Sequence, residues 1–329
     1  MSSMIPRKLK TGDEIRVIAP ARSIGLIGEN LTKIAKEKLE EMGFKVTFGK
    51  NVNEKDEFIS SSIKSRIQDL HEAFLDKNVK MIMPVIGGYN SNQLLKSIDW
   101  SIIKENPKII GGYSDITALQ NALFAKTGLV TYSSPNFSVF GMKKGFEYIK
   151  DYFNKCLIEE KEFFINPSEK WSNDAWYLNQ EDRLFIKNEG PYVINEGETE
   201  GEILGGNLCT FQLLHGTEYI PSLKGSILFL EDDEYTNPML FDRDLQSLIH
   251  QSGFSQIKGI IIGRFEKKSE FTKEILTKVI KTKKELDKIP VIADVDFGHT
   301  YPMITFPIGG KARISAFFNK KIKIEILEH

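Results

Sequence analysis

The sequence predicts an α/β protein in which a domain built on a parallel sheet precedes a mixed, β-rich domain. Three observations support this prediction. The chain has 329 residues, which exceeds the length at which one hydrophobic core usually keeps growing. Its first part alternates continuous apolar runs with amphipathic helical patterns. Its last part contains more apolar runs than helical patterns.

Residues 1–140 are predicted to form the first domain. A buried parallel sheet requires continuous apolar strands separated by amphipathic helices, because crossover helices cover both of its faces. The predicted strands are EIRVIAP, KVTFG, VKMIMPVIGG, PKIIGGYSD and LVTYSSP, and the predicted helices are LTKIAKEKLEEMGF, SRIQDLHEAFLDKN, NQLLKSI and ITALQNALFAKTG. Three strands end in turns rich in Gly, Pro or Ser. Because ligands bind beyond the carboxyl ends of parallel strands, these turns are expected to surround one site.

Two further segments complete the predicted organisation. Residues 141–195 lose the periodic pattern and contain two tryptophans in EKWSNDAWYLN, which predicts a linker with an active-site loop; a disordered connector is the alternative. Residues 196–329 contain the strands GEILGG, GSILFLED, KGIIIGRF, PVIADV, ARISAF and KIKIEIL. Two helical patterns, MLFDRDLQSLIHQSG and TKEILTKVIKTKKEL, interrupt them.

Composition and charge exclude several classes of protein. Hydrophobic residues make up 41% of the chain and charged residues 27%, which is typical of a globular protein with a substantial core. The net charge of -1 provides no basic field for nucleic acid or anionic lipid. Two isolated cysteines indicate neither a disulfide framework nor a zinc knuckle. Without a long apolar stretch, the sequence favours a cytoplasmic protein that neither spans nor binds a membrane.

Ser114 is the first candidate catalytic residue. It lies in PKIIGGYSDITALQNAL, between an apolar strand and a helix. At such a turn the helix N-terminus offers a positive dipole and free backbone N–H groups, which suits an acyl-transfer nucleophile. The pattern is not G-x-S-x-G, because Ile116 replaces the last glycine. A helix N-cap is the alternative role for Ser114.

Ser91, in VIGGYNSNQLL, is the competing serine. It also follows a Gly-Gly pair at a strand end, although capping of the next helix explains it equally well. Gly87 and Gly88 allow the backbone to approach a ligand closely. A backbone N–H from this turn and the N–H of Asp115 are therefore predicted to stabilise an oxyanion.

His299 is the strongest candidate for the base that accepts the serine proton. Histidine is the usual base because its pKa lies near neutrality. The other four histidines fit surface or packing positions, whereas the segment DVDFGHTYPMITFPIGG places His299 among turn residues directly after a strand.

Glu231 is the candidate that orients the imidazole. In GSILFLEDDEY it stands closest to the apolar strand, and the three acids that follow it are expected to face water. A solvated acidic turn is the alternative. The resulting order Ser, Glu, His also occurs in α/β serine hydrolases.

These residues resemble the motifs of the LD-carboxypeptidase family of serine peptidases, and within it the microcin C self-immunity branch. The similarity runs from LKTGDEIRVIAPA through IGGYNSNQLL, NPKIIGGYSDITAL, AKTGLVTYSSP, EKWSNDAW, GGNL and ILFLEDDE to GHTYPMITFPIGG. The resemblance implies that Ser114 is the nucleophile, Glu231 the orienting acid and His299 the base. It also implies oxyanion donors at the backbones of Gly88 and Asp115.

Further expectations come from the same resemblance. It implies a homodimer with a Rossmann-like N-terminal domain, a β-rich, barrel-like C-terminal domain, and no metal or organic cofactor. Tyr89, Asn207, Trp171 and Trp176 are expected to contact substrate, with a hydrophobic plug between the domains as the alternative for the two tryptophans.

Three functions remain open at the level of sequence. The favoured function is hydrolysis of a peptidyl or aminoacyl nucleotide amide, as in microcin C-like immunity. The second is removal of D-alanine from a murein tetrapeptide. The third is binding of a small ligand without turnover, which would not require Ser114, Glu231 and His299 together.

Overall fold

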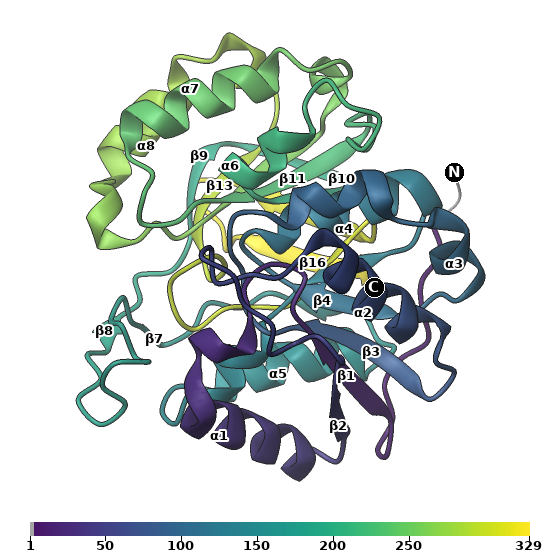
Figure 1. Ribbon diagram of the computed structural model, residues 1–329. Coiled ribbons are helices and arrows are strands. Elements are labelled where there is room, and N and C mark those ends of the chain that lie inside the picture. The colour runs from purple at the N-terminus through teal and green to yellow at the C-terminus, as the bar shows by residue number, and fades with distance from the viewer. Residues whose placement is uncertain (1–2) are drawn as a thin grey trace.

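The computed structural model describes residues 3–329 and contains two large sheets and a small hairpin (Figure 1). Residues 1 and 2, which begin the first predicted domain, lie outside the described residues. Helix α4 packs against strands of both large sheets. The predicted fold class is confirmed: an α/β domain with a parallel sheet is followed by a β-rich domain.

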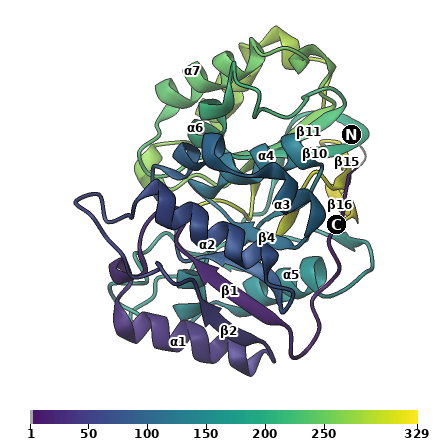
Figure 2. The same ribbon diagram turned by 45° about the vertical axis from the view of Figure 1, so that its right-hand side comes forward.

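The first sheet has the strand order β14-β5-β4-β3-β1-β2. Its five N-terminal strands are parallel, and the chain switches direction between β1 and β3. Helices α1 and α5 cover one face of this sheet and α2, α3 and α4 the other (Figure 2). The bounds are β1 Glu14–Ile18, α1 Gly28–Glu41, β2 Lys45–Phe48, α2 Ile63–Leu75, β3 Val79–Pro84, α3 Trp100–Glu105, β4 Ile109–Gly112, α4 Ile116–Thr127 and β5 Thr131–Ser133.

Strand β14 (Phe306–Ile308) joins this sheet from the far end of the chain. It pairs with β5 in the antiparallel direction, which the sequence did not predict. The apolar run around it is only three residues long and follows several turn residues, so it gives no strand pattern of its own. Its position means that the C-terminal part of the chain completes the N-terminal sheet.

The second sheet has eight strands in the order β6-β16-β15-β10-β11-β12-β13-β9. Strands β10 to β13 are parallel, and α7 and α8 form the crossovers between them, at the top of Figure 1. With edges at β6 and β9, the sheet is open rather than barrel-like. The bounds are β10 Gly197–Asn207, α6 Leu208–Phe211, β11 Ser226–Glu231, α7 Pro238–Ile249, β12 Gly259–Gly263, α8 Lys273–Lys281, β13 Val291–Val295, β15 Lys311–Ala316 and β16 Lys323–Glu328.

Residues 141–195 are more regular than the sequence predicts. Helix α5 (Glu147–Leu157) buries an apolar face that includes Tyr152 and Phe153, and short strands follow it. Two of these, β7 and β8, form a hairpin that projects from the body of the molecule (Figure 1). The strands are β6 Phe163–Phe164, β7 Lys170–Trp171, β8 Ile186–Lys187 and β9 Tyr192–Asn195.

Three phenylalanines join the two sheets beside the segment that carries His299. Phe229 lies on β11, Phe306 on β14, and Phe297 between β13 and His299. Their ring centroids are 4.7 to 5.7 Å apart, and all three rings are buried. Because a close-packed core resists displacement, this cluster fixes the position of the His299 turn.

Candidate active site

The turn between β4 and α4 holds Ser114 in an unusual backbone conformation. Its φ is 65°, in the left-handed region that costs a residue with a side chain about 1–3 kcal/mol. Asp115 occupies the N-cap position of α4. The expected alternative for Ser114, a helix cap, is therefore not what the structure shows. Instead, its hydroxyl contacts an imidazole.

Ser114, His299 and Glu231 form one hydrogen-bonded chain across the two sheets. Nε2 of His299 lies 3.1 Å from Oγ of Ser114. Nδ1 of His299 lies 2.8 Å from Oε2 of Glu231. The structure thus brings together the three residues that the sequence singles out, although 185 positions separate the serine from the histidine.

Glycines create the space that Glu231 occupies at the end of β11. The carboxylate is 3% exposed, as its position after an apolar strand predicts. A Cβ on Gly298 would lie 2.7 Å from Oε2 of Glu231, and a Cβ on Gly263 would lie 3.0 Å from the Cβ of Glu231. A side chain at Gly298 would therefore displace the carboxylate that holds the imidazole, and one at Gly263 would also meet the carbonyl oxygen of Phe297 at 2.5 Å.

The pKa of His299 reflects two opposing influences. Burial alone would lower it, but the charge of Glu231, the hydrogen bond to it and the negative charges of Asp233 and Glu266 together raise the pKa of His299 to about 9. This environment stabilises the imidazolium, which is the form that follows removal of a proton from serine.

The predicted oxyanion donors lie beside the serine. A Cβ on Gly87 would come within 2.9 Å of Oγ of Ser114 and 3.5 Å of the amide nitrogen of Asp115. Throughout residues 3–329, the backbone N–H groups of Gly88 and Asp115 donate to no protein acceptor. They are therefore free to donate to an oxyanion.

Ser91 does not lie in a position to act as the nucleophile. It is fully buried, and its hydroxyl donates to the backbone carbonyl of Asp115 at 2.6 Å. The carboxylate of Asp115 accepts the N–H groups of Asn90 and Ser91. These contacts attach the Gly-Gly turn after β3 to the nucleophile turn after β4.

The four residues expected to contact substrate occupy different environments. Tyr89 is 63% exposed and stacks with Arg22. Asn207 is buried, caps α6 and contacts Asp232. Trp176 is 3% exposed and packs edge-on against Tyr301, so in this conformation it is a packing residue. Trp171, on the hairpin, lies under the guanidinium of Arg264.

The sequence missed several side chains around the imidazole. Asp232 was expected to face water, but it is 1% exposed, and burial with the nearby charge of Glu231 raises its pKa to about 7. Burial is also the main cause that raises the pKa of Glu266 to about 7. The ring of Tyr113 packs at a tilt against His299, and its hydroxyl contacts the hydroxyl of Tyr301. The only sequence signal for Tyr113, Asp232 and Tyr301 is that each lies within two positions of a predicted triad residue.

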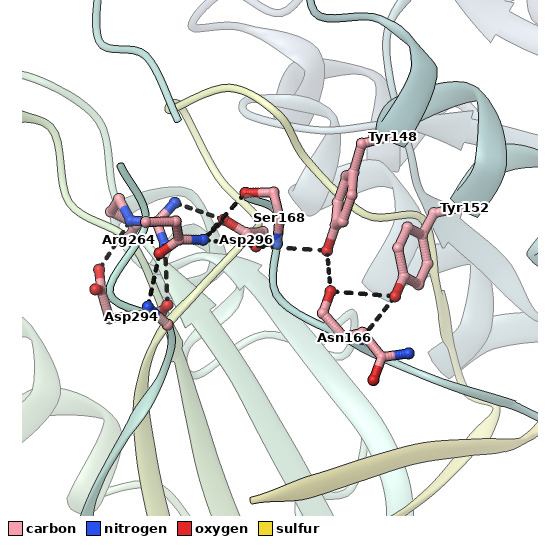
Figure 3. Close-up of polar contacts among 9 residues, drawn as sticks. Tyr148, Tyr152, Asn166, Ser168, Arg264, Asp294 and Asp296 are labelled. Atoms are coloured by element: carbon pink, nitrogen blue, oxygen red, sulfur yellow. Dashed lines mark hydrogen bonds and ion pairs between the residues drawn. The ribbon is translucent and has the colours of Figure 1, made fainter. Parts of the chain in front are cut away.

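A buried polar network connects the His299 segment to residues 141–195 (Figure 3). Arg264 is 3% exposed and forms ion pairs with Asp294 and Asp296. Asp296 also accepts the backbone N–H of Ser168 at 2.7 Å, and Asn188 contacts both Asp296 and Arg264. The network therefore joins β12, β13 and both ends of the hairpin segment just before His299.

The described residues contain neither a cluster suited to a metal ion nor a helix suited to crossing a membrane. Residues 3–329 contain no group of three or more His, Cys, Asp or Glu residues arranged to hold a metal ion. Among the same residues, no helix has the length and apolar character needed to cross a membrane.

Comparison with known families identifies the chain. Residues 15–134 match the LD-carboxypeptidase N-terminal domain, and residues 200–314 match the LD-carboxypeptidase C-terminal domain. The chain belongs to the LD-carboxypeptidase family, peptidase family S66. It is therefore a hydrolase of the serine carboxypeptidase type.

Named relatives of this LD-carboxypeptidase span nearly the whole chain. "Putative carboxypeptidase YocD" of Bacillus subtilis (strain 168) is 53% identical over 95% of this chain and 96% of its own. "Microcin C7 self-immunity protein MccF" of Escherichia coli is 33% identical over 98% and 95%. "Probable murein peptide carboxypeptidase" of Bacillus subtilis is 30% identical over 94% and 91%. The relatives thus include both functional branches of the family.

Solved structures of the family have the same fold. An MccF-like protein from Bacillus anthracis str. Ames superimposes with a TM-score of 0.98 at 54% identity, covering 99% of this chain and 100% of that one. MccF in complex with aspartyl sulfamoyl adenosine superimposes with a TM-score of 0.89 at 32% identity, covering 99% of each chain. The expected resemblance to the MccF-like branch is confirmed.

Proposed function

We propose that this carboxypeptidase hydrolyses a small peptidic amide through a Ser114–His299–Glu231 triad. The observation that carries the proposal is the continuous hydrogen-bonded chain from Glu231 Oε2 to Ser114 Oγ through both imidazole nitrogens. A nucleophile next to a base that a third group orients is the arrangement that activates serine.

The proposed reaction begins when neutral His299 removes the proton of Ser114, whose Oγ attacks the amide carbonyl carbon. The resulting oxyanion accepts hydrogen bonds from the N–H groups of Gly88 and Asp115; loss of one such donor typically raises the barrier by about 2.7–4 kcal/mol. The imidazolium then protonates the leaving amine and the C–N bond breaks. Water, deprotonated by His299, hydrolyses the acyl-enzyme and restores Ser114.

We infer that the substrate is an acidic aminoacyl or peptidyl nucleotide, so that the reaction detoxifies a microcin C-like conjugate. Support comes from the relatives: MccF has been described in complex with aspartyl sulfamoyl adenosine and with glutamyl sulfamoyl guanosine, and this chain resembles it along its whole length. The second candidate is removal of D-alanine from a murein tetrapeptide, which the 30% identical murein peptide carboxypeptidase favours.

A paired assay tests the substrate. Purified protein is given aspartyl or glutamyl sulfamoyl adenosine and, separately, a murein tetrapeptide, and the released products are quantified by mass. Faster turnover of the sulfamoyl adenosine, measured as kcat/KM, supports the immunity function. Faster turnover of the tetrapeptide assigns the protein to cell-wall recycling instead.

Replacement of Ser114 tests the catalytic assignment. Ser114→Ala removes the nucleophile but leaves a small side chain, so hydrolysis should be lost while the thermal unfolding curve is unchanged. The matched control is Ser101→Ala, whose exposed hydroxyl donates to Asp99 at the start of α3 and contacts no triad residue. Labelling by a fluorophosphonate should require Ser114. Full activity of Ser114→Ala would show that another residue is the nucleophile, and a failure of the native protein to label favours a ligand-binding protein without turnover.

The expected homodimer and cytoplasmic location are also proposals, and both rest on the family resemblance. Light scattering during size-exclusion chromatography measures the first: a mass of twice 37.5 kDa is expected, and a monomer at micromolar concentration contradicts it. Fractionation of cells that produce the protein measures the second.

A further inference from the structure

Two tyrosines stand beside the catalytic residues, one on each of the turns that meet at the proposed triad. Tyr113 directly precedes Ser114 in the turn after β4. Tyr301 follows His299 by two positions in the segment after β13. The hydroxyl oxygens of the two tyrosines lie 3.2 Å apart. This hydrogen bond therefore joins the nucleophile turn to the base turn, in addition to the contact between serine and imidazole.

The two hydrogen bonds of His299 do not by themselves fix the plane of its imidazole. Nδ1 is bonded to Glu231 and Nε2 to Ser114, so the bonds hold the ring along the line between its two nitrogens. A tilt about this line turns both nitrogens away from their partners, and hydrogen bonds weaken as they depart from linearity. The ring of Tyr113 lies off this line. It packs against the imidazole with 5.3 Å between the ring centroids and 57° between the ring planes, and so opposes the tilt.

Tyr301 is itself held by the segment that contains the β7–β8 hairpin. Its backbone N–H donates to the carbonyl of Ser172 at 3.0 Å, and its carbonyl accepts the N–H of Ser172 at 2.6 Å. Ser172 is fully buried. The ring of Trp176 packs edge-on against the ring of Tyr301, with 6.0 Å between their centroids. Since both its backbone and its ring are restrained, Tyr301 provides a fixed partner for the hydroxyl of Tyr113.

Both hydroxyls of the pair stay protonated at neutral pH. Desolvation is the main cause that raises the pKa of Tyr113 and that of Tyr301, and the negative charge of Glu266 acts in the same direction on both. A protonated phenol donates one hydrogen bond and can accept another. The two hydroxyls can therefore bond to each other, but neither can replace His299 as the base.

We propose that Tyr301 is a positioning residue of the active site: its hydroxyl holds Tyr113 against the imidazole, which keeps Nε2 of His299 directed at Ser114. This inference rests on the proposed serine-peptidase function and adds a pair of residues to it. Neither tyrosine transfers a proton, and both act through His299. Because a displacement of about 1 Å in a reacting group can slow a reaction on the order of 100-fold, a contact that orients the base affects the rate.

Packing alone is the alternative role for the pair. Two half-buried aromatic side chains at the junction of the sheets would stabilise the fold whatever their effect on the imidazole. Replacement of each tyrosine by phenylalanine separates the two roles, because it removes the hydroxyl and keeps the ring. Loss of the hydrogen bond lowers stability under either role, whereas only the positioning role lowers the rate at which Ser114 reacts.

A fluorophosphonate measures the reactivity of the serine without a peptidic substrate. Oγ of Ser114 displaces fluoride from phosphorus while His299 accepts the serine proton, so contacts with an acyl group or a leaving amine do not enter the rate. Tyr113→Phe and Tyr301→Phe should each be labelled about 3- to 10-fold more slowly than the native protein, which is the fold-change that corresponds to one hydrogen bond between neutral groups. The double variant should be labelled no more slowly than the slower single variant, because both changes remove the same bond.

The pH dependence of labelling provides a second measurement. Neither replacement removes a charge near His299, so the pH at which the labelling rate levels off should be the same in Tyr301→Phe and in the native protein. A displaced pH profile would assign the hydroxyls a part in proton transfer and overturn the positioning role.

The matched control is Tyr152→Phe. It removes a tyrosine hydroxyl that donates to the carbonyl of Phe164 and accepts the N–H of Asn166, and the ring of Tyr152 is buried. This variant should be labelled at the native rate even if it unfolds at a lower temperature.

Two results overturn the proposal while the peptidase function stands. One is labelling of Tyr301→Phe at the native rate, which leaves packing as the role of the pair. The other is a double variant in which the two single effects multiply, since the hydroxyls would then not act through one bond. A native protein that is not labelled overturns the serine-peptidase function itself. Thermal unfolding verifies that each variant is folded, and Tyr113→Phe tests the same bond if Tyr301→Phe is not.

Discussion

His299 lies between a carboxylate that favours its charged form and a hydroxyl that needs its neutral form. Glu231 accepts from Nδ1 at 2.8 Å, so Nε2 is left to act on Ser114. With a pKa raised to about 9, the imidazole is a strong base, but only a small fraction of it is neutral at pH 7. The negative charges around His299 make its imidazole a stronger base. They also reduce the fraction of the imidazole that is neutral at pH 7 and able to accept the serine proton.

This balance predicts the pH dependence of the reaction. Because only neutral His299 can accept the serine proton, kcat/KM should rise about tenfold per pH unit until it levels off near pH 9. In Glu231→Gln, which removes the largest influence that raises the pKa, the imidazole should titrate at a lower pH. An NMR titration of the imidazole protons in both proteins measures the shift, with His299→Gln used for assignment; equal titration midpoints contradict the prediction.

His299 also affects the stability of the folded protein, and the direction of its pKa shift determines how that stability changes with pH. The pKa of His299 rises from 6.5 to about 9 on folding, so folding binds the proton more tightly. The tighter binding of this proton by His299 stabilises the folded state fully below pH 6.5, and the stabilisation is lost as the pH rises through about 9. Urea unfolding between pH 6 and pH 10 should show this loss in the native protein and a smaller one in His299→Gln.

Gly87, in the turn after β3, determines whether Ser114 can keep its position. Gly87→Ala should lower kcat at least 100-fold, since the added Cβ would lie 2.9 Å from both Cβ and Oγ of Ser114 and a displaced reacting group carries a penalty of about this size. Gly25→Ala is the matched control: its Cβ would meet neighbours no closer than 3.7 Å. Steady-state kinetics measures both; an active Gly87→Ala protein with native kcat contradicts the steric argument.

The buried network around Arg264 joins β12, β13 and the segment that holds the β7–β8 hairpin. Its loss should therefore affect the stability of the protein and the attachment of this segment. Arg264→Met leaves Asp296 buried without its cation, which typically costs about 3–5 kcal/mol. Arg313→Met is the control, because Arg313 is half exposed in its pairs with Glu200 and Glu325, where a surface pair contributes about 0–1 kcal/mol. Urea unfolding measures both free energies. A cost for Arg264→Met no greater than that of the control would show that the network is not structural.

Sequence reasoning succeeded where a pattern is local. Apolar runs and helical periods located the central strands and the nucleophile turn, and a carboxylate next to an apolar strand indicated a buried Glu231. It failed where burial depends on distant partners. Asp232 follows Glu231 in an acidic run that reads as solvated, yet the packing of α6 and β11 buries it. The β14 strand is another such case, because only its partner β5 makes it a strand.

For the whole molecule, β14 implies that the N-terminal domain is incomplete without the C-terminal one. A protein restricted to residues 1–140 would expose the edge of β5 that β14 covers, and an uncovered strand edge promotes aggregation. We expect residues 1–140 alone to form large particles at concentrations at which the full chain does not. Light scattering of both proteins measures this, and a cooperatively unfolding monomer of residues 1–140 contradicts it.

Strand β14 also has a consequence for the timing of synthesis on the ribosome. The segment that runs from β13 past His299 to β14 and β15 leaves the ribosome after all of β1 to β12, and Ser114 leaves it 185 residues before His299. A nascent chain therefore displays its nucleophile long before it acquires a base. With the proposed triad, the protein can hydrolyse its substrate only after one late step of folding, in which the segment from β13 to β15 joins both sheets and brings His299 to Ser114.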